Sequence, residues 1–231
     1  MKKHGKLYVE ASKNVDKNKT YTVDEAIETL KSLSKRKFDE TVEVAVRLNI
    51  DTKKSDMNVR NSLVLPNGTG KIKKILVITK SQAAEAKEAG ADYVGEADMI
   101  EKIEKENWFD FDVIVATPDM MTSLGKIGKV LGPKGLMPNP KLGTVTTNVK
   151  NAIENIKKGQ VEYKNDSYGN VHVLVGKLSF TETSLKENLI AIVKEISKNK
   201  PNGVKGTFIK NISISSTMSP GIKLDITSFN L

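Results

Sequence analysis

The first third of the chain combines a helical pattern with a strand pattern. Apolar residues three and four positions apart predict a helix over 22–33. Thr22, followed three residues later by Glu25, predicts a capping box at the start of this helix. From 41 to 50 apolar and polar residues alternate, which predicts a strand with one face in the core. A second strand is predicted just before the turn sequence PNGTG at 66–70.

The pattern changes in the middle of the chain. Unbroken runs of apolar, mostly β-branched residues at 74–79 and 112–117 predict strands that are covered on both faces. Helical patterns lie between and after these runs, and two of them end at glycines, Gly90 and Gly159. The predicted helices span 81–90, 97–107 and 147–159. Strands that alternate with helices predict a parallel, doubly wound sheet.

Alternating strands and an amphipathic helix return after Gly159. Ser184 and Glu187 predict a capping box for a long helix over 184–198. The predicted strands of this part span 170–176, 208–215 and 222–229. Segments typical of an antiparallel sheet therefore flank a block that is typical of a parallel one.

These patterns predict an α/β protein of two domains. Residues 1–66 and 160–231 would form one α+β domain with split β-α-β character, and residues 67–159 would form an inserted, Rossmann-like α/β domain. Such an insertion is well tolerated at a turn. Charge divides the insert, because 85–119 has three lysines and eleven acidic residues whereas 120–160 has seven lysines and one acidic residue. An anionic ligand would be attracted to one side only.

The composition favours a folded protein with a polyanionic partner. The chain has 231 residues, of which 38% are hydrophobic and 28% charged, as is typical of a soluble globular protein. The net charge of +9 favours nucleic acid first and an anionic membrane surface second, and a generous lysine surface is the alternative. No apolar run is long enough for a membrane span, and the N-terminal sequence lacks the apolar core of a secretory signal. We expect a cytoplasmic protein without a membrane partner.

The residue types argue against an enzyme. The chain has no cysteine and only His4 and His172, which excludes disulfides and cysteine-based zinc sites and disfavours a histidine metal site. Asp110, Asp112 and Asp119 surround a predicted strand, where carboxylates usually cap backbone groups or stay solvated. No nucleophile motif accompanies His172, which is either a packed or exposed strand residue or an RNA contact. We predict no catalytic residue, no metal and no cofactor.

The stretch GKIGKVLGPKGLMPNPKLGTVT at 125–146 could be a phosphate-binding loop, a disordered linker or a shaped surface. The spacing of the known phosphate loops is absent and Pro133 lacks an N–H, so a variant phosphate site is the minor alternative. Prolines stiffen the stretch although it has almost no helix or strand pattern. We predict a rigid basic surface that faces RNA; the alternative is a structural cap over the insert's sheet that contacts the other domain. Its lysines are Lys126, Lys129, Lys134 and Lys141.

Two further clusters suggest RNA binding. Lys35, Arg36 and Lys37 precede Phe38, and a cation beside an aromatic ring can neutralise a phosphate while the ring stacks on a base. Alternatively, these cations only complement the end of a helix. A run of hydroxyl side chains ends at Met218 before a turn, which is either an ordinary turn or a site for 2′-OH and phosphate groups. The candidates from these clusters and from the end of the first strand are Arg36, Lys37, Phe38, Lys53, Lys54, Ser213, Thr217 and Met218.

Six motifs carry a resemblance to a known family: the start KHGKLY, KRKFDETVEVAVRLNID, VLPNGTGK, GPKGLMPNPKLG, GKLSF and the pair TM before a turn. In this order they resemble the bacterial ribosomal protein L-one family, the large-subunit protein of the mobile stalk near the tRNA exit site. The resemblance covers essentially the whole chain. It implies a structural constituent of the large ribosomal subunit with a nucleotide-free insert. It also implies binding to a stalk segment of large-subunit ribosomal RNA, help in releasing tRNA from the exit site, and repression of its own operon through its messenger RNA.

The resemblance also implies roles for particular residues. The implied RNA contacts are Lys37, Phe38, Thr217 and Met218, with Lys53, Lys54, His172 and Lys177 as weaker matches. Ser219, also kept as a candidate, stands where the family usually has glycine. If that position needs left-handed backbone, serine costs about 1 kcal/mol and weakens RNA binding, unless Pro220 and Gly221 shift the turn. Thr52 replaces a usual proline, which should affect a turn more than recognition. The competing functions are a nucleotide-dependent enzyme in the insert and a purely protein-binding module.

Overall fold

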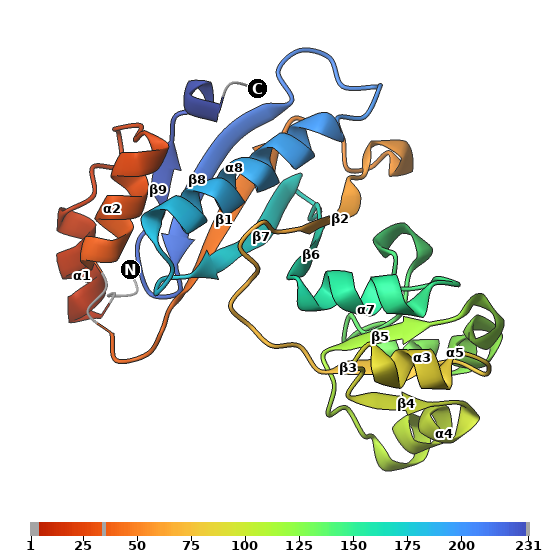
Figure 1. Cartoon of the computed structure of the whole chain (residues 1–231). Helices are drawn as coiled ribbons and strands as arrows, with labels where there is room; N and C mark the ends of the chain where they lie inside the picture. Colours follow the sequence, from red (N-terminus) through yellow and green to blue (C-terminus); the bar gives the residue numbers. More distant parts are fainter. Residues whose placement is uncertain (1–4, 34–35, 230–231) are drawn as a thin grey trace. The chain divides into compact units, whose positions relative to one another are not determined.

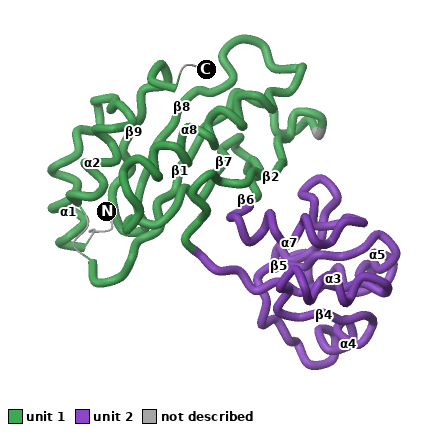
Figure 2. Tube along the Cα trace, viewed as in Figure 1, with its two compact units in different colours: residues 1–70, 161–231 green, residues 71–160 purple. Residues whose placement is uncertain are grey.

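The computed structural model describes residues 5–33 and 36–229 and divides the chain into two compact units. Unit 1 consists of Met1–Gly70 and Val161–Leu231, and unit 2 consists of Lys71–Gln160 (Figure 2). The sequence-based boundaries, 66/67 and 159/160, lie a few residues from these divisions. Each unit has a hydrophobic core of its own.

Unit 1 is built on a four-stranded antiparallel sheet. Its strand order is β7 (Asn170–Lys177), β1 (Thr41–Leu48), β8 (Ile209–Ser216) and β9 (Ile222–Leu224). The helices α2 (Val23–Leu33) and α8 (Glu182–Lys198) pack on one face, and α8 crosses in front of the strands in Figure 1. The side chains of β1 alternate between the core and the other face, as the sequence pattern predicts. The face without these helices is therefore left for polar residues.

The two predicted capping boxes have different outcomes. The backbone N–H of Glu25 donates to Thr22 Oγ1 (3.4 Å) and that of Thr22 donates to Glu25 Oε2 (3.1 Å), which confirms the first box. The box at Ser184 is wrong. Thr181 is the N-cap of α8, since its Oγ1 accepts from the backbone N–H of Ser184 (3.2 Å), and the helix starts earlier than predicted.

The other elements of unit 1 are shorter. The helix α1 (Lys6–Lys13) was not predicted from the sequence. The strand β2 (Arg60–Val64) was predicted, and it pairs with β6 (Gln160–Lys164). A 3₁₀ helix spans Ser55–Met57. The predicted strand over 222–229 ends at Leu224, and a 3₁₀ helix (Ile226–Phe229) follows it. Asp225 causes this change, because its carboxylate accepts from the backbone N–H and the hydroxyl of Thr227 (3.0 and 2.7 Å).

Unit 2 contains the predicted parallel sheet, with strand order β4 (Tyr93–Gly95), β3 (Ile75–Ile78) and β5 (Val113–Ala116). Alternate residues of β3 enter two different core clusters, so both faces are covered. One cluster includes α3 (Ala83–Glu88) and α7 (Val149–Lys157). The other includes α4 (Ala97–Glu106), α5 (Met121–Lys126) and α6 (Gly128–Leu131). The α/β fold class is confirmed.

The prediction that the stretch 125–146 contains almost no helix is wrong. This stretch holds the end of α5, all of α6 and a 3₁₀ helix at Pro140–Leu142. Leu124, Ile127 and Leu131 are buried in the core of unit 2, at a helical spacing that the intervening glycines conceal. The stretch therefore packs on the sheet of unit 2. This packing agrees with the first half of the structural-cap alternative, a cap over the sheet of the insert.

Candidate nucleic-acid interface

The sheet of unit 1 brings distant candidates together at one end. The turn after β8 lies beside the start of β1, where Thr217 Oγ1 accepts from the backbone N–H of Thr41 (3.1 Å). On the other side of β1, Thr41 pairs with Lys177, whose Nζ donates to Thr41 Oγ1 (2.9 Å). Phe38 lies three residues before Thr41. Residues more than 170 positions apart therefore share this end of the sheet, which we call the Thr41 end.

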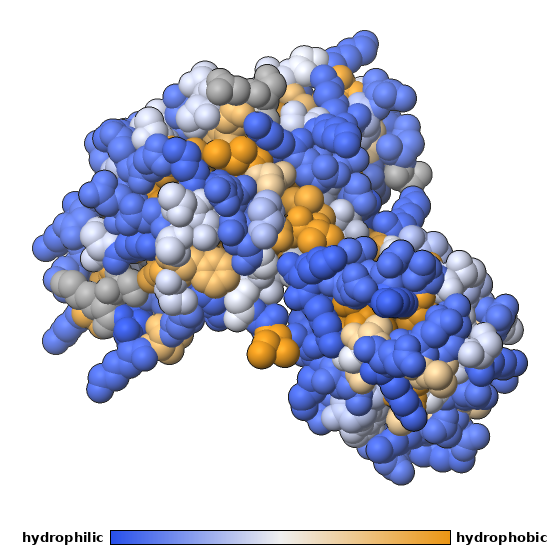
Figure 3. Space-filling model, viewed as in Figure 1, coloured by the Kyte–Doolittle hydropathy of each residue, from blue (hydrophilic) through white to orange (hydrophobic). Residues whose placement is uncertain are grey.

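The side chains at the Thr41 end combine charge, hydroxyl and apolar groups. Phe38 is 53% exposed and Met218 is 46% exposed, although both are large and apolar. Lys37 and Thr217 are also exposed, and Arg36 is half-buried. In the view of Figure 3 most of the surface is hydrophilic, with hydrophobic residues in small patches. Exposed apolar groups beside cations form a surface on which a base can stack while its phosphates are neutralised.

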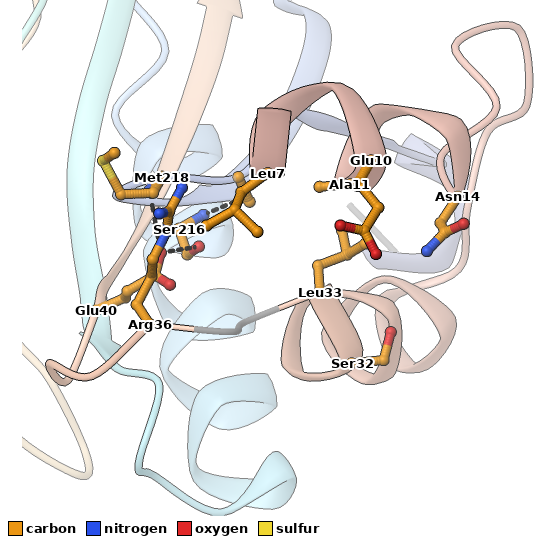
Figure 4. Close-up of a pocket in the computed structure, with 11 residues that line it drawn as sticks. Leu7, Glu10, Ala11, Asn14, Ser32, Leu33, Arg36, Glu40, Ser216 and Met218 are labelled. Atoms are coloured by element: carbon orange, nitrogen blue, oxygen red, sulfur yellow. Dashed lines mark hydrogen bonds between the residues drawn. The ribbon is translucent and has the colours of Figure 1, made fainter. Parts of the chain in front are cut away.

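A buried carboxylate that sequence reasoning missed holds the turn in place. Glu40 is only 2% exposed, and its Oε2 accepts from Ser216 Oγ (2.6 Å) and from the backbone N–H of Met218 (3.0 Å), as drawn in Figure 4. Glu40 therefore fixes the backbone that presents Thr217 and Met218. The sequence offers no signal for this role, since its partners lie 176 and 178 residues away.

Ser219 does not adopt the left-handed backbone on which the conditional cost of replacing glycine depended. Among the described residues other than glycine, only Asn107 has a positive φ, so Ser219 is outside the left-handed region. Its Oγ accepts from the backbone N–H of Ser216 (2.8 Å) and donates to the carbonyl of Pro220 (3.1 Å). The serine closes the turn with its own hydrogen bonds, and the expected cost is absent.

Two other candidates lie on the open face of the sheet. Ala45 of β1 pairs with His172 of β7 on one side and with Ser213 of β8 on the other. The three residues form one row across the middle of the sheet, where His172 is exposed and Ser213 is half-buried. They share the sheet with the Thr41 end, but they do not belong to that cluster.

Lys53 and Lys54 lie far from the Thr41 end. Both follow β1, whose eight residues span roughly 25 Å, and both are exposed. Thr52 ties their loop to the β6–β7 turn, because its hydroxyl donates to the carbonyl of Ser167 (2.7 Å). The structure therefore places these lysines at the opposite end of the sheet. Lys35, like His4, lies outside the described residues.

The four candidate lysines of unit 2 are all exposed. Lys126 ends α5 and Lys129 lies on α6, while Lys141 lies in the 3₁₀ helix that Asn139 caps through its side-chain oxygen. Lys134 Nζ lies 4.1 Å from the centroid of the Phe109 ring, within range of a cation–π contact. The stretch thus packs apolar residues inward and leaves its cations outside.

Asp110 and Asp112 of unit 2 have structural partners. Asp112 accepts from Lys71 Nζ (2.9 Å), and the hydrogen bond holds the pKa of its carboxyl below the usual value. Asp110 accepts from Lys74 Nζ (2.6 Å) and from the Tyr93 hydroxyl (2.9 Å), and the Lys74 bond lowers its pKa most. Asp119 is the second residue of the 3₁₀ helix Pro118–Met120. Over 5–33 and 36–229 no group of three or more histidine, cysteine or acidic residues could hold a metal ion.

A family model described as ribosomal protein L1p/L10e matches residues 30–220, which is most of the chain. The chain belongs to this family. Family members from Mesoplasma florum and Persephonella marina, both named large ribosomal subunit protein uL1, are 58% and 54% identical to it. The first match covers 92% of this chain and 93% of the relative, and the second covers 99% and 96%. The resemblance inferred from the motifs is confirmed.

As a member of the L1 family the protein is a ribosomal protein, and its place is the ribosome in the cytoplasm. The helices within the described part of the chain are too short or too polar to cross a membrane.

Proposed function

We propose that this L1-family protein is a structural, non-catalytic constituent of the large ribosomal subunit that binds a stalk segment of its ribosomal RNA. Both relatives carry the name of a large-subunit protein. The observation that carries the RNA proposal is the cluster at the Thr41 end, where Phe38, Met218, Thr217 and Lys177 converge from three parts of the chain.

The chemistry of this cluster suits folded RNA. Hydroxyl and backbone groups at Thr217 can bond to 2′-OH and phosphate oxygens, while Phe38 and Met218 offer apolar contact to an unstacked base. The net charge of +9 supplies the general attraction to a polyanion. The exposed lysines of 125–146 would add a second, auxiliary contact from unit 2.

We further propose that the same surface binds a stalk-like fold in the protein's own messenger RNA and so represses its operon. The two RNAs should then compete, and any substitution at the Thr41 end should weaken both to the same extent. We also propose that the ribosome-bound protein assists the release of tRNA from the exit site. Ribosomes that lack the protein should then release exit-site tRNA more slowly.

Hydroxyl-radical footprinting on purified large-subunit ribosomal RNA tests the main proposal. We expect protection confined to one structured segment. The logarithm of the protein's affinity for this segment should fall linearly with the logarithm of the salt concentration, with a slope of about 0.7–0.9 per phosphate neutralised. Diffuse protection, with no preference for RNA over heparin, would instead indicate a purely charged or protein-binding surface.

A further inference from the structure

An open groove of about 430 Å³ lies beside the turn at 217–219 in unit 1. Its walls come from three segments: the start of α1, Arg36 and the turn itself. This volume falls within the range of small-ligand sites, about 300–1,000 Å³. Figure 4 shows a narrower pocket that shares several of the same walls, with Leu7, Arg36 and Met218 beside one another. The groove residues that matter below are Lys6, Leu7, Arg36, Thr217 and Met218.

The helix α1 forms this groove without contributing much to the core. None of its eight residues is buried, and only Ala11 packs partly against the core of unit 1. An isolated helix shorter than about 12–15 residues is marginal in water. Leu7, 42% exposed, remains uncovered on the groove side. A ligand in the groove would cover Leu7 and stabilise α1.

The groove's chemistry identifies the ligand. Leu7 and Met218 provide apolar walls from different segments, whereas Lys6 and Arg36 provide positive charge. No acidic residue lines the groove within the described part of the chain. A planar apolar group attached to a negative charge fits this combination, and the groove is continuous with Thr217 and Met218 of the Thr41 end.

We propose that the groove holds one unstacked nucleobase of the bound RNA, with Lys6 and Arg36 near its flanking phosphates. This inference rests on the proposed RNA-binding function. It assigns α1 as the second wall of the RNA site. Recognition in single-stranded RNA loops commonly uses bases that leave the stack in this way.

Photocrosslinking can test the position of the groove, because the chain has no cysteine. Leu7→Cys creates a single thiol inside the groove. Val9→Cys creates one on the same helix at a residue that is equally exposed (45%) but does not line the groove. With a benzophenone on each thiol and stalk ribosomal RNA as the probe, position 7 should crosslink to one or two nucleotides with a yield at least tenfold above position 9. Equal yields would overturn the proposal.

A second experiment distinguishes a base from the RNA backbone. Leu7→Ser should raise the Kd for the stalk RNA about tenfold, and Val9→Ser should not change it. Replacing the crosslinked nucleotide with an abasic one should raise the Kd of the native protein to the same extent. On this abasic RNA, Leu7→Ser should cause no further rise in the Kd. Equal losses from Leu7→Ser on intact and abasic RNA would overturn base recognition. If the native protein does not prefer stalk RNA at all, the proposed function fails as well, whereas specific binding that is insensitive to Leu7→Ser refutes the groove alone.

Discussion

Replacing Glu40 with alanine should cost both stability and RNA affinity. The substitution removes the acceptor of the hydrogen bonds from Ser216 Oγ and from the backbone N–H of Met218, at a site that is 2% exposed. A buried donor that loses its acceptor costs about 1–3 kcal/mol, so the two donors set a range of about 2–6 kcal/mol. Removal of the carboxylate also relieves its desolvation cost. We therefore expect a loss near the lower end, about 3 kcal/mol.

Urea unfolding measures this loss, and the exposed Glu43 of β1 gives a matched control. Glu43→Ala should stay within about 0.5 kcal/mol of the native protein. Glu40→Gln keeps the shape and one oxygen acceptor, so it should recover part of both the stability and the RNA affinity. Because Glu40 is buried, its substitution should lower RNA affinity without changing the salt dependence. A Glu40→Ala protein as stable as the Glu43→Ala control would refute the reasoning.

Three further predictions concern other contacts. Asn188 is fully buried and makes three hydrogen bonds to backbone groups, so Asn188→Ala should lower the free energy of unfolding by about 3 kcal/mol in urea titration, and a loss below about 1 kcal/mol would contradict this. The pKa of Asp112 is lowered by its hydrogen bond from Lys71, so the stabilisation that this carboxylate contributes is present above the ordinary aspartate pKa of 3.8 and is lost as pH falls through the lower folded pKa. The stabilities of the native protein and of Asp112→Asn should therefore converge in acid, and a gap that persists there would exclude this linkage. Reversing Lys134 and Lys141 to glutamate should lower RNA affinity and flatten its salt dependence, whereas an unchanged slope would assign the stretch 125–146 to structure alone.

The local parts of the fold could be predicted from the sequence because they depend on short-range patterns. The alternation in β1 and the buried runs of β3 and β5 give the correct strands, since each pattern reflects which faces are covered. The errors have local causes too. Thr181 competes with Ser184 as the cap of α8, and Gly125 of α5 and Gly128 of α6 mask a helical spacing.

The candidate site was predictable only in part. Phe38, Thr217 and Met218 belong to recognisable motifs. The contacts that bring these motifs together join residues that are 176 and 178 positions apart in the sequence. In the sequence Glu40 looks like an ordinary polar residue before a strand. Only its long-range contacts in the structure reveal its role. Lys53 and Lys54 are as basic as Lys37, yet β1 separates them from the Thr41 end.

Binding of Phe38→Ala and Thr217→Ala proteins to stalk ribosomal RNA and to random RNA tests the central claim most directly. Tyr168→Ala is the matched control, because this exposed aromatic residue precedes β7, at the opposite end of the sheet from Thr41. Each substitution at the Thr41 end should raise the Kd for stalk RNA about tenfold or more, with little change for random RNA and none for the control. Equal losses on both RNAs, or no loss at all, would contradict the assignment of the Thr41 end as the surface that recognises ribosomal RNA.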